Sequence, residues 1–174
     1  MSATQPSPAR PRFGREGEHP RGDLGQLVLL AVFLAVWILD SFVLGFSTLG
    51  ASILPLVFRL VCAGVLFLGA LALARKAHLV VSDEVRREGR LVREGPFARV
   101  RHPLYLAAIL FYVSLVVATL SLASAALLGG ILAFYDVIAT YEEGFLRRKH
   151  GDAYRAYQRK VPKWIPRLRA AEFE

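Results

Sequence analysis

Residues 24–46 read LGQLVLLAVFLAVWILDSFVLGF, and this stretch decides the class of fold. Only Gln26, Asp40 and Ser41 interrupt its apolar character. A transmembrane helix needs about 20 predominantly apolar residues, so the stretch is long enough to cross a bilayer with some tilt. The apolar region of a secretory signal is only about 7–15 residues long. The sequence therefore predicts a retained transmembrane helix and not a cleaved signal.

Three further apolar stretches follow the first. Residues 47–52 (STLGAS) predict a short turn, after which residues 53–74 form a second span. Residues 104–120 and 122–140 form a second apolar pair that breaks near Ser121. The predicted fold class is all-α: a multi-pass integral membrane protein of about four transmembrane helices, arranged as two hairpins and followed by a cytoplasmic C-terminal helical segment.

The composition agrees with a membrane protein. Of the 174 residues, 55% are hydrophobic and 21% are charged, the mean hydropathy is +0.42 and the formal net charge is +8. A globular protein has about 45–50% apolar residues spread along the chain, whereas here they are concentrated in a few stretches. No folded basic module accompanies the positive charge, so no nucleic-acid partner is expected. The single cysteine, Cys62, excludes an intrachain disulfide.

Lysine and arginine are distributed unevenly between the two sides of the predicted membrane domain. Four precede the first span, eight lie between the second and third spans, nine follow the fourth, and neither intervening turn has any. Positive residues near span ends stay on the cytoplasmic side, so both termini are predicted to be cytoplasmic, at the inner membrane if the protein is bacterial. Residues 1–23 are predicted to be a disordered tail, and residues 24–174 a single membrane domain.

Two charged residues lie inside the predicted spans. Asp40 and Arg59 are at similar distances from the turn between the first two spans, which places them at similar depth on adjacent antiparallel helices. An intramembrane charge is costly unless it has a partner or a function. The sequence therefore predicts an ion pair between them. The alternatives are that Arg59 binds an anionic substrate headgroup, or that its charge reaches the outer interface.

The sequence GPFARVRHPLY, residues 95–105, lies where the polar segment enters the third span. Pro103 suits the first turn of a helix because its missing amide proton is not needed there. Arg101 and His102 stand just before it, where free backbone amides and the positive helix end favour an anion. The position therefore suits a carboxylate. On this segment alone, the favoured interpretation is instead that the arginines are topological anchors, His102 is a polar cap and Tyr105 belongs to the interfacial aromatic belt.

A second polar group follows the fourth span. Glu142 and Glu143 are adjacent, so at most one of them faces inward easily from a helix. Acidic residues contribute little to topology, which favours a functional role, with a solvated helix end as the equal alternative. Gly151 suits a helix C-cap, and a short amphipathic helix bearing Tyr154 and Tyr157 is predicted after it.

The residues after that helix have a simpler interpretation. Pro162 and Pro166 end the helix, because proline cannot continue it. Trp164 beside Lys163 is typical of an anchor at the membrane interface.

Together, the two motifs resemble a known family. GPFARVRHPLY, an apolar hairpin and EEGFLRRKHGDAYRAYQRKVPKWIP occur in the order found in the isoprenylcysteine carboxyl methyltransferase family of integral membrane enzymes, which includes small prokaryotic members. The resemblance covers about residues 91–168. The chain departs from the usual pattern at Phe97, where the family has tyrosine, at Ala107 and Ala108, where glycine is common, and at His150, where phenylalanine is common.

The resemblance implies an S-adenosyl-L-methionine-dependent methyltransferase whose cofactor lies against the cytoplasmic segments 91–103 and 141–168. The implied catalytic residues are Arg101, Glu142 and Glu143. The implied cofactor-binding residues are His102, Pro103, Tyr105, Glu142, Tyr154 and Tyr157, of which the last two would sandwich the adenine. The implied acceptor is lipophilic, an isoprenylcysteine-like carboxyl group that enters from the bilayer among membrane lipids. No metal is implied.

Three alternatives stay open at this point. A related enzyme would methylate the amine of a phospholipid headgroup. An NADPH-dependent sterol-type reductase would share a similar RHPxY and GxxYxxY arrangement. A family member without activity would serve as a small membrane scaffold.

Overall fold

The computed structural model describes residues 22–85 and 91–173, and all regular secondary structure within them is helical. The long helices are α1 (Gly22–Ile38), α2 (Leu56–Val85), α3 (Pro103–Thr119) and α4 (Leu122–Lys160). The short elements are the π-helix η1 (Leu39–Leu44), which continues α1, and the 3-10 helices η2 (Leu49–Ser52) and η3 (Gly95–Ala98). The predicted all-α class is confirmed for the described residues. The predicted tail lies almost wholly outside them.

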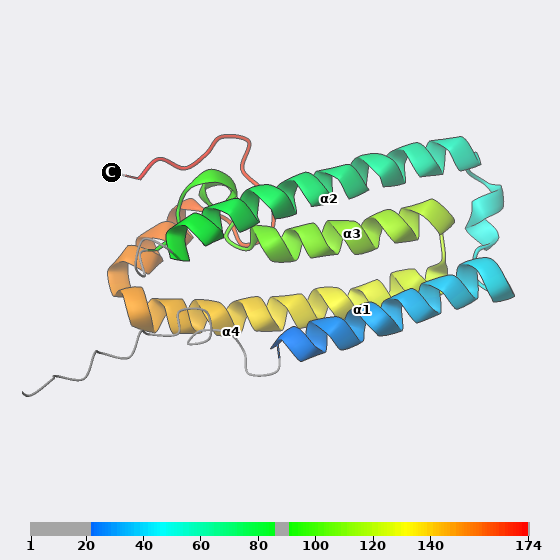
Figure 1. Cartoon of the computed structure of the whole chain (residues 1–174), viewed down its shortest axis with the longest axis horizontal. Helices are drawn as coiled ribbons and strands as arrows, with labels where there is room; N and C mark the ends of the chain where they lie inside the picture. The colour runs from blue at the N-terminus through cyan, green and yellow to red at the C-terminus, as the bar shows by residue number, and fades with distance from the viewer. Residues whose placement is uncertain (1–21, 86–90, 174) are drawn as a thin grey trace, which may run out of the picture.

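The four long helices run alongside one another in two layers (Figure 1). α2 packs along α3, and α1 packs along α4, so the two helices of the first predicted hairpin do not pack along each other. A buried apolar cluster joins the layers, with members Phe33 from α1, Ile109 and Tyr112 from α3, and Ile131 and Tyr135 from α4. Lipid is as apolar as these side chains, so close packing rather than transfer from water must hold such helices together in a bilayer.

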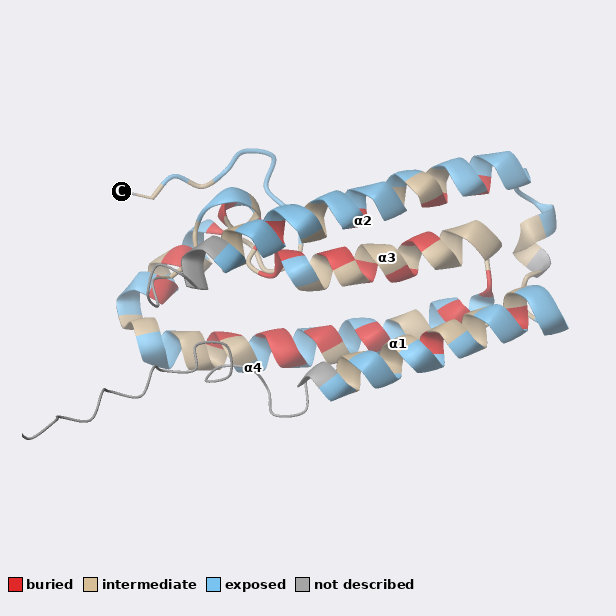
Figure 2. Cartoon of the chain, viewed as in Figure 1, coloured by how far each residue is buried: buried red, intermediate tan, exposed pale blue. Residues whose placement is uncertain are grey.

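The outward faces of the bundle are apolar and exposed, most continuously on α2 (Figure 2). Among the described residues, three helical segments are long and apolar enough to cross a membrane: Leu24–Leu44, Leu56–Ser82 and Leu122–Lys160. α3 is apolar but has 17 residues, which gives a length of about 25 Å against a hydrocarbon core of about 30 Å. These helices support an integral membrane protein, and the third predicted span is the short one.

The predicted boundaries of the second span are wrong at both ends. α2 begins at Leu56, directly after Pro55, because η2 ends at Ser52 and residues 53–55 form a turn between the two elements. It continues to Val85, well beyond the predicted end at Ala74. Arg75 and Lys76 do not stop the helix, since both are good helix formers whose long stems let the charge reach the membrane surface.

α4 also extends beyond its prediction, and it changes direction at one glycine. The helix passes Thr140 and continues until Gly151, whose backbone angles are φ 54° and ψ −125°. A positive φ is cheap only for glycine. A second helical stretch bearing Tyr154 and Tyr157 follows, as the sequence predicts (Figure 1).

The predicted ion pair between Asp40 and Arg59 is wrong. The Asp40 carboxylate accepts hydrogen bonds from the backbone and hydroxyl of Ser47, at 2.9 and 2.5 Å, and from the hydroxyl of Ser121 at 2.5 Å. Arg59 Nη1 instead donates to the carbonyl of Ala118 at 3.0 Å. The last carbonyls of α3 lack helical partners and carry the negative end of the helix dipole, which attracts the guanidinium.

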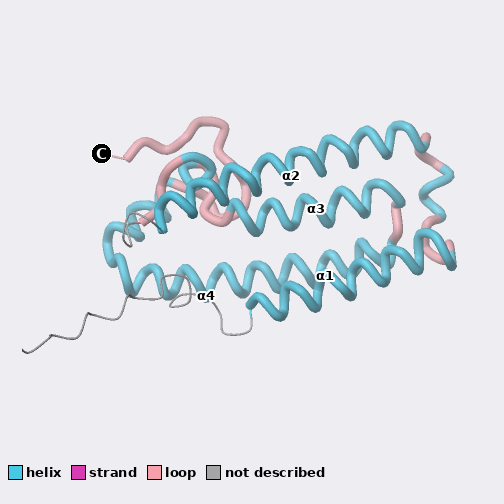
Figure 3. Tube along the Cα trace, in the orientation of Figure 1, coloured by secondary structure: helices cyan, strands magenta, loops and turns pink. Residues whose placement is uncertain are grey.

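Residues 161–173, here called the strap, pass over the end of the bundle where α3 begins (Figure 3). Three backbone hydrogen bonds of 2.9–3.0 Å join the strap to the segment ahead of α3: Arg101 N–H to Pro162 O, Arg167 N–H to Arg99 O, and Ala171 N–H to Ala98 O. The strap thus brings the second sequence motif onto the first.

Candidate functional site

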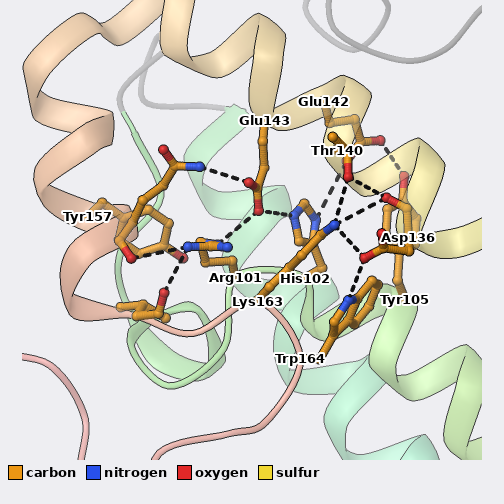
Figure 4. A network of polar contacts seen from close by, with 12 residues as sticks. Arg101, His102, Tyr105, Asp136, Thr140, Glu142, Glu143, Tyr157, Lys163 and Trp164 are labelled. Atoms are coloured by element: carbon orange, nitrogen blue, oxygen red, sulfur yellow. Dashed lines mark hydrogen bonds and ion pairs between the residues drawn. The ribbon is translucent and has the colours of Figure 1, made fainter.

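The candidate site lies where the amino end of α3 meets the polar part of α4 and the strap (Figure 4). η3 and the positive φ of Gly95 (58°) turn the chain toward α3. Pro103 is the first residue of α3 and His102 its N-cap, and no side chain caps the helix. The first-turn amides of α3 therefore lack the side-chain acceptor that usually satisfies such groups.

Glu143 is the centre of the site. Its Oε1 lies 2.9 Å from Arg101 Nε and 3.1 Å from His102 Nε2, and its Oε2 accepts a hydrogen bond from Gln158 Nε2 at 2.8 Å. The carboxylate is buried, so these partners replace the water that it would lose. Of the two adjacent glutamates, Glu143 is the one that faces inward.

Glu142 lies beside this cluster and is the more exposed glutamate, with 22% side-chain exposure against 8% for Glu143. The Tyr105 hydroxyl donates to Glu142 Oε1. His102 Nδ1 lies 3.8 Å from Glu142 Oε2, and its ring is parallel to the Tyr105 ring at 5.7 Å. His102 therefore stands between two carboxylates, one on each ring nitrogen.

The charge state of Glu143 follows from these contacts. Residues 141–160 contain nine charged side chains, so this part of α4 lies outside the apolar span. Burial alone raises the pKa of Glu143. The hydrogen bond with His102 and the positive charge of Arg101 lower the pKa by more than burial raises it, so the pKa lies below its ordinary value of 4.5. Glu143 is an anion at neutral pH.

Arg101 connects the cluster to the strap. Its Nη1 donates to the carbonyls of Gln158 and Val161, at 3.1 and 3.2 Å. A planar guanidinium can serve several acceptors at fixed angles, and here it joins Glu143 to the end of α4. Because its guanidinium contacts Glu143 and these two carbonyls, Arg101 has a structural role in the site.

Tyr154 and Tyr157 form a buried cluster with Val161 behind Arg101. The Tyr157 hydroxyl donates to the carbonyl of Phe97 at 2.8 Å. Burial raises the pKa of both phenols, so both hydroxyls stay protonated. Their role in holding adenine stays a prediction, and it requires these closely packed rings to separate.

The sequence placed Asp136 on the same helix face as Glu143, but it did not predict that Trp164 contacts Asp136 and His102. The Trp164 ring packs against His102 at 5.9 Å, and its Nε1 donates to Asp136 Oδ1 at 2.9 Å. Lys163 Nζ lies 2.5 Å from the same oxygen and also donates to Thr140 at 2.8 Å. Trp164 is therefore a wall of the site and not only an interfacial anchor. The available signal was Asp136, an acidic residue within an apolar span.

Arg59, the predicted substrate ligand, is not brought to this cluster. It contacts the carboxyl end of α3, whereas His102 precedes the amino end. The length of α3 separates these two ends by about 25 Å. Arg101, His102, Tyr105, Glu142 and Glu143 do come together, as the two motifs predict.

An apolar groove of about 540 Å³ lies next to the cluster, between α1, α2 and α3. Gln26 of α1 stands at one end, and most of the lining is aliphatic or aromatic. Tyr135 forms part of the wall, and its ring packs on Tyr105 at 5.2 Å. The polar cluster and the groove are therefore separated by two tyrosine rings.

Among the described residues, no three His, Cys, Asp or Glu side chains are grouped so that they would hold a metal ion. The two glutamates are engaged with His102, Arg101 and Tyr105 instead.

Comparison with known proteins finds two curated relatives and a matching family model. The chain is 30% identical over 137 residues to the cobalt-zinc-cadmium resistance protein CzcN of Cupriavidus metallidurans, covering 78% of this chain and 61% of that protein. It is 32% identical over 91 residues to the protein-S-isoprenylcysteine O-methyltransferase of Schizosaccharomyces pombe, covering 52% of this chain and 38% of that protein. No solved structure matches.

The chain thus spans less than two thirds of the length of both curated relatives. Residues 58–153 match the family model described as phospholipid methyltransferase. This range includes the amino end of α3 and both glutamates, so the match covers the centre of the candidate site. The resemblance predicted from the two motifs is confirmed, and the chain belongs to the phospholipid methyltransferase family.

Proposed function

We propose that this protein transfers a methyl group from S-adenosyl-L-methionine to a lipophilic acceptor taken from the bilayer. One juxtaposition carries the proposal: the buried cluster of Arg101, His102 and Glu143 lies behind the rings of Tyr105 and Tyr135, and the apolar groove lies in front of them. A polar site for a charged donor and an apolar path for an acceptor therefore adjoin.

The residues at this position fit the methionine end of the donor. The uncapped amino end of α3, with His102, would hold its carboxylate. Glu142, the more exposed glutamate, would attract its ammonium group. When bound, S-adenosyl-L-methionine supplies a methyl group that its positively charged sulfur already activates for transfer.

Glu143 and Trp164 would support the transfer without touching the reacting atoms. Glu143 holds Arg101 and His102 in fixed positions, so the charges that face the donor need no rearrangement during the reaction. Trp164 covers His102 and would keep bulk water from the cluster. The main task of these residues is to align the acceptor with the methyl group.

We propose the carboxyl group of an isoprenylcysteine-like molecule as the acceptor. Such a group is ionised at neutral pH and needs no general base. Its apolar chain would occupy the groove, whose wall includes Leu27, Leu71 and Phe111. The similarity to a protein-S-isoprenylcysteine O-methyltransferase supports this choice.

A phospholipid amine is the second candidate acceptor, and Glu142 is the observation that favours it. A protonated amine must lose a proton before methylation, which requires a base within hydrogen-bonding reach. Glu142 is hydrogen-bonded to Tyr105, whose ring packs on Tyr135 in the wall of the groove, so an acceptor headgroup would approach Glu142 past these two rings. The name of the matching family model also points to phospholipids.

Calorimetry on the detergent-purified protein tests the donor. We expect saturable binding of S-adenosyl-L-methionine and none of NADPH, with binding lost in Glu142→Gln and retained in the matched variant Asp152→Asn, whose carboxylate is exposed on the same helix. Binding of NADPH alone would establish the reductase alternative. Binding of neither ligand to a folded sample would favour the scaffold.

Transfer of a labelled methyl group distinguishes the two acceptors. We expect label in farnesylcysteine derivatives with a free carboxyl group and none in their esters. Label in phosphatidylethanolamine, with none in the prenylcysteines, would replace the first acceptor by the second.

We also propose that the end of the bundle carrying the site faces the cytoplasm. The charged segments before α1, after α2 and after α4 support this orientation. In a Cys62→Ser background, Thr48→Cys should react with an impermeant maleimide added to intact cells, whereas Arg159→Cys should react only after lysis. The reverse pattern would invert the topology.

A further inference from the structure

A second hollow lies on the other side of the segment that precedes α3. Its volume is about 550 Å³, and α2, the residues of η3 and the strap form its walls. Ala72, Leu73 and Pro96 contribute apolar surface, and Lys76 and Arg99 also line it. We call it the basic hollow. It shares no lining residue with the apolar groove.

The charges of the basic hollow are unbalanced. None of the described residues that line it is acidic. Within the described part of the chain, the side chains of Lys76 and Arg99 form no hydrogen bond or ion pair. By contrast, Arg101 pairs with Glu143, and Lys163 pairs with Asp136. The protein thus leaves two cations at one concave surface, which favours an anion there.

The position of the hollow indicates which anion. α2 is a span whose apolar stretch covers Leu56–Ser82, so Ala72, Leu73 and Lys76 lie in the last part of a membrane-crossing helix. Cations at that depth meet lipid headgroups, and basic pockets beside transmembrane helices bind anionic ones. The apolar walls suit the glycerol and upper acyl chain of a lipid. A soluble phosphate has no apolar part that would contact these walls.

We propose that the basic hollow binds one anionic phospholipid through its phosphate group, with Lys76 and Arg99 as the ligands. The site is independent of the methyl-transfer proposal. A lipid bound there would join α2 to the segment and strap that position Arg101, because Arg167 N–H is hydrogen-bonded to the carbonyl of Arg99.

Native mass spectrometry of the delipidated full chain in detergent tests this proposal, with phosphatidylglycerol and phosphatidylcholine of identical acyl chains as ligands. Each basic residue near a membrane surface raises affinity for anionic lipid by about fivefold. We therefore expect one phosphatidylglycerol to bind at least about tenfold more tightly than phosphatidylcholine, and Lys76→Gln with Arg99→Gln to remove most of that preference.

The matched control is Arg75→Gln with Arg159→Gln, which removes the same charge from two exposed residues outside the hollow. It should change the preference by less than about twofold. Equal losses in both double variants would overturn the proposal, since they would indicate only general attraction to the surface. If inorganic phosphate displaced the lipid at equal concentration, the site would belong to a soluble anion. If the double variant Lys76→Gln with Arg99→Gln does not fold, each of its two substitutions is tested alone in the same experiment.

Discussion

Within the described residues, each end of the helical bundle contains one buried carboxylate, and the partners of the two are opposite in kind. Asp40 is 5% exposed and accepts only from neutral donors, the backbone and hydroxyl of Ser47 and the hydroxyl of Ser121. Glu143 is 6% exposed and its partners include Arg101 and His102.

This difference separates a structural contact from a candidate for chemistry. Around Asp40, Ser47 also accepts from the backbone of Ala123 and joins the two turns at that end, so every group serves the fold. Around Glu143, two ionisable side chains and a second glutamate lie beside an apolar groove. Charges that can exchange partners with a ligand are present at only one of these two clusters.

The sharpest test of this contrast is Glu143→Gln. Removing one partner of a buried ion pair costs about 3–5 kcal/mol, and a loss of about 3 kcal/mol in transition-state stabilisation lowers a rate by about 100-fold. We expect methyl transfer per folded molecule to fall by at least that factor, as measured with the labelled donor. Near-normal turnover would remove Glu143 from the proposed site.

The counterpart at the other end is Asp40→Asn, which should affect stability instead. The amide cannot accept the same set of hydrogen bonds, and an unsatisfied buried group costs about 1–3 kcal/mol. We expect a lower thermal midpoint in detergent, with kcat/KM per folded molecule unchanged. A specific loss of turnover without a stability change would mean that the two ends are coupled.

Tyr105→Phe is expected to have a smaller effect. The change removes the hydrogen bond to Glu142 but keeps the ring between His102 and Tyr135. A hydrogen bond to a charged group contributes about 1.5–3 kcal/mol, so donor affinity should fall by about tenfold or more. Tyr141→Phe, on an exposed ring, is the control. Equal effects of the two changes would count against a role for Tyr105.

The smallest expected effect is on pH dependence. The pKa of Glu143 in the folded protein lies below its ordinary value of 4.5. Its ionised form therefore stabilises the folded state above about pH 4.5, and this contribution is lost as the pH falls through the lower, folded-state pKa. Thermal midpoints of wild type should decline more steeply than those of Glu143→Gln from about pH 5 to about pH 3. Parallel curves would show that Glu143 does not contribute.

Local sequence signals predicted most of the helices and identified residues that the structure brings together. The break at Gly151 and the start of α3 at Pro103 follow from backbone preferences that act within a few residues. Glu142 and Glu143 both lie at the site, and the structure decides that Glu143 faces inward. That choice depends on how α4 is rotated against α3, which spacing along the chain does not determine.

The errors concern side chains whose partners are distant in sequence. Spacing along the chain predicted Asp40 and Arg59 at matching depth, yet Asp40 contacts Ser121 and Arg59 contacts the carbonyl of Ala118. Likewise, Trp164 has the surroundings of an interfacial anchor until the strap folds back onto His102. Reasoning by depth in the membrane does not include these contacts, because they come from packing between segments about 60 or more residues apart.

The strap has a consequence for how the protein is made. A ribosome produces residues 161–173 after all four helices, at about 5–20 residues per second. Until they emerge, Arg101 lacks the carbonyls of Val161 and Pro162, and His102 lacks the ring of Trp164. The bundle would thus be inserted in the membrane first and the cluster around Arg101 completed last. Under the proposed function, a nascent chain could not bind the methyl donor before the strap is made.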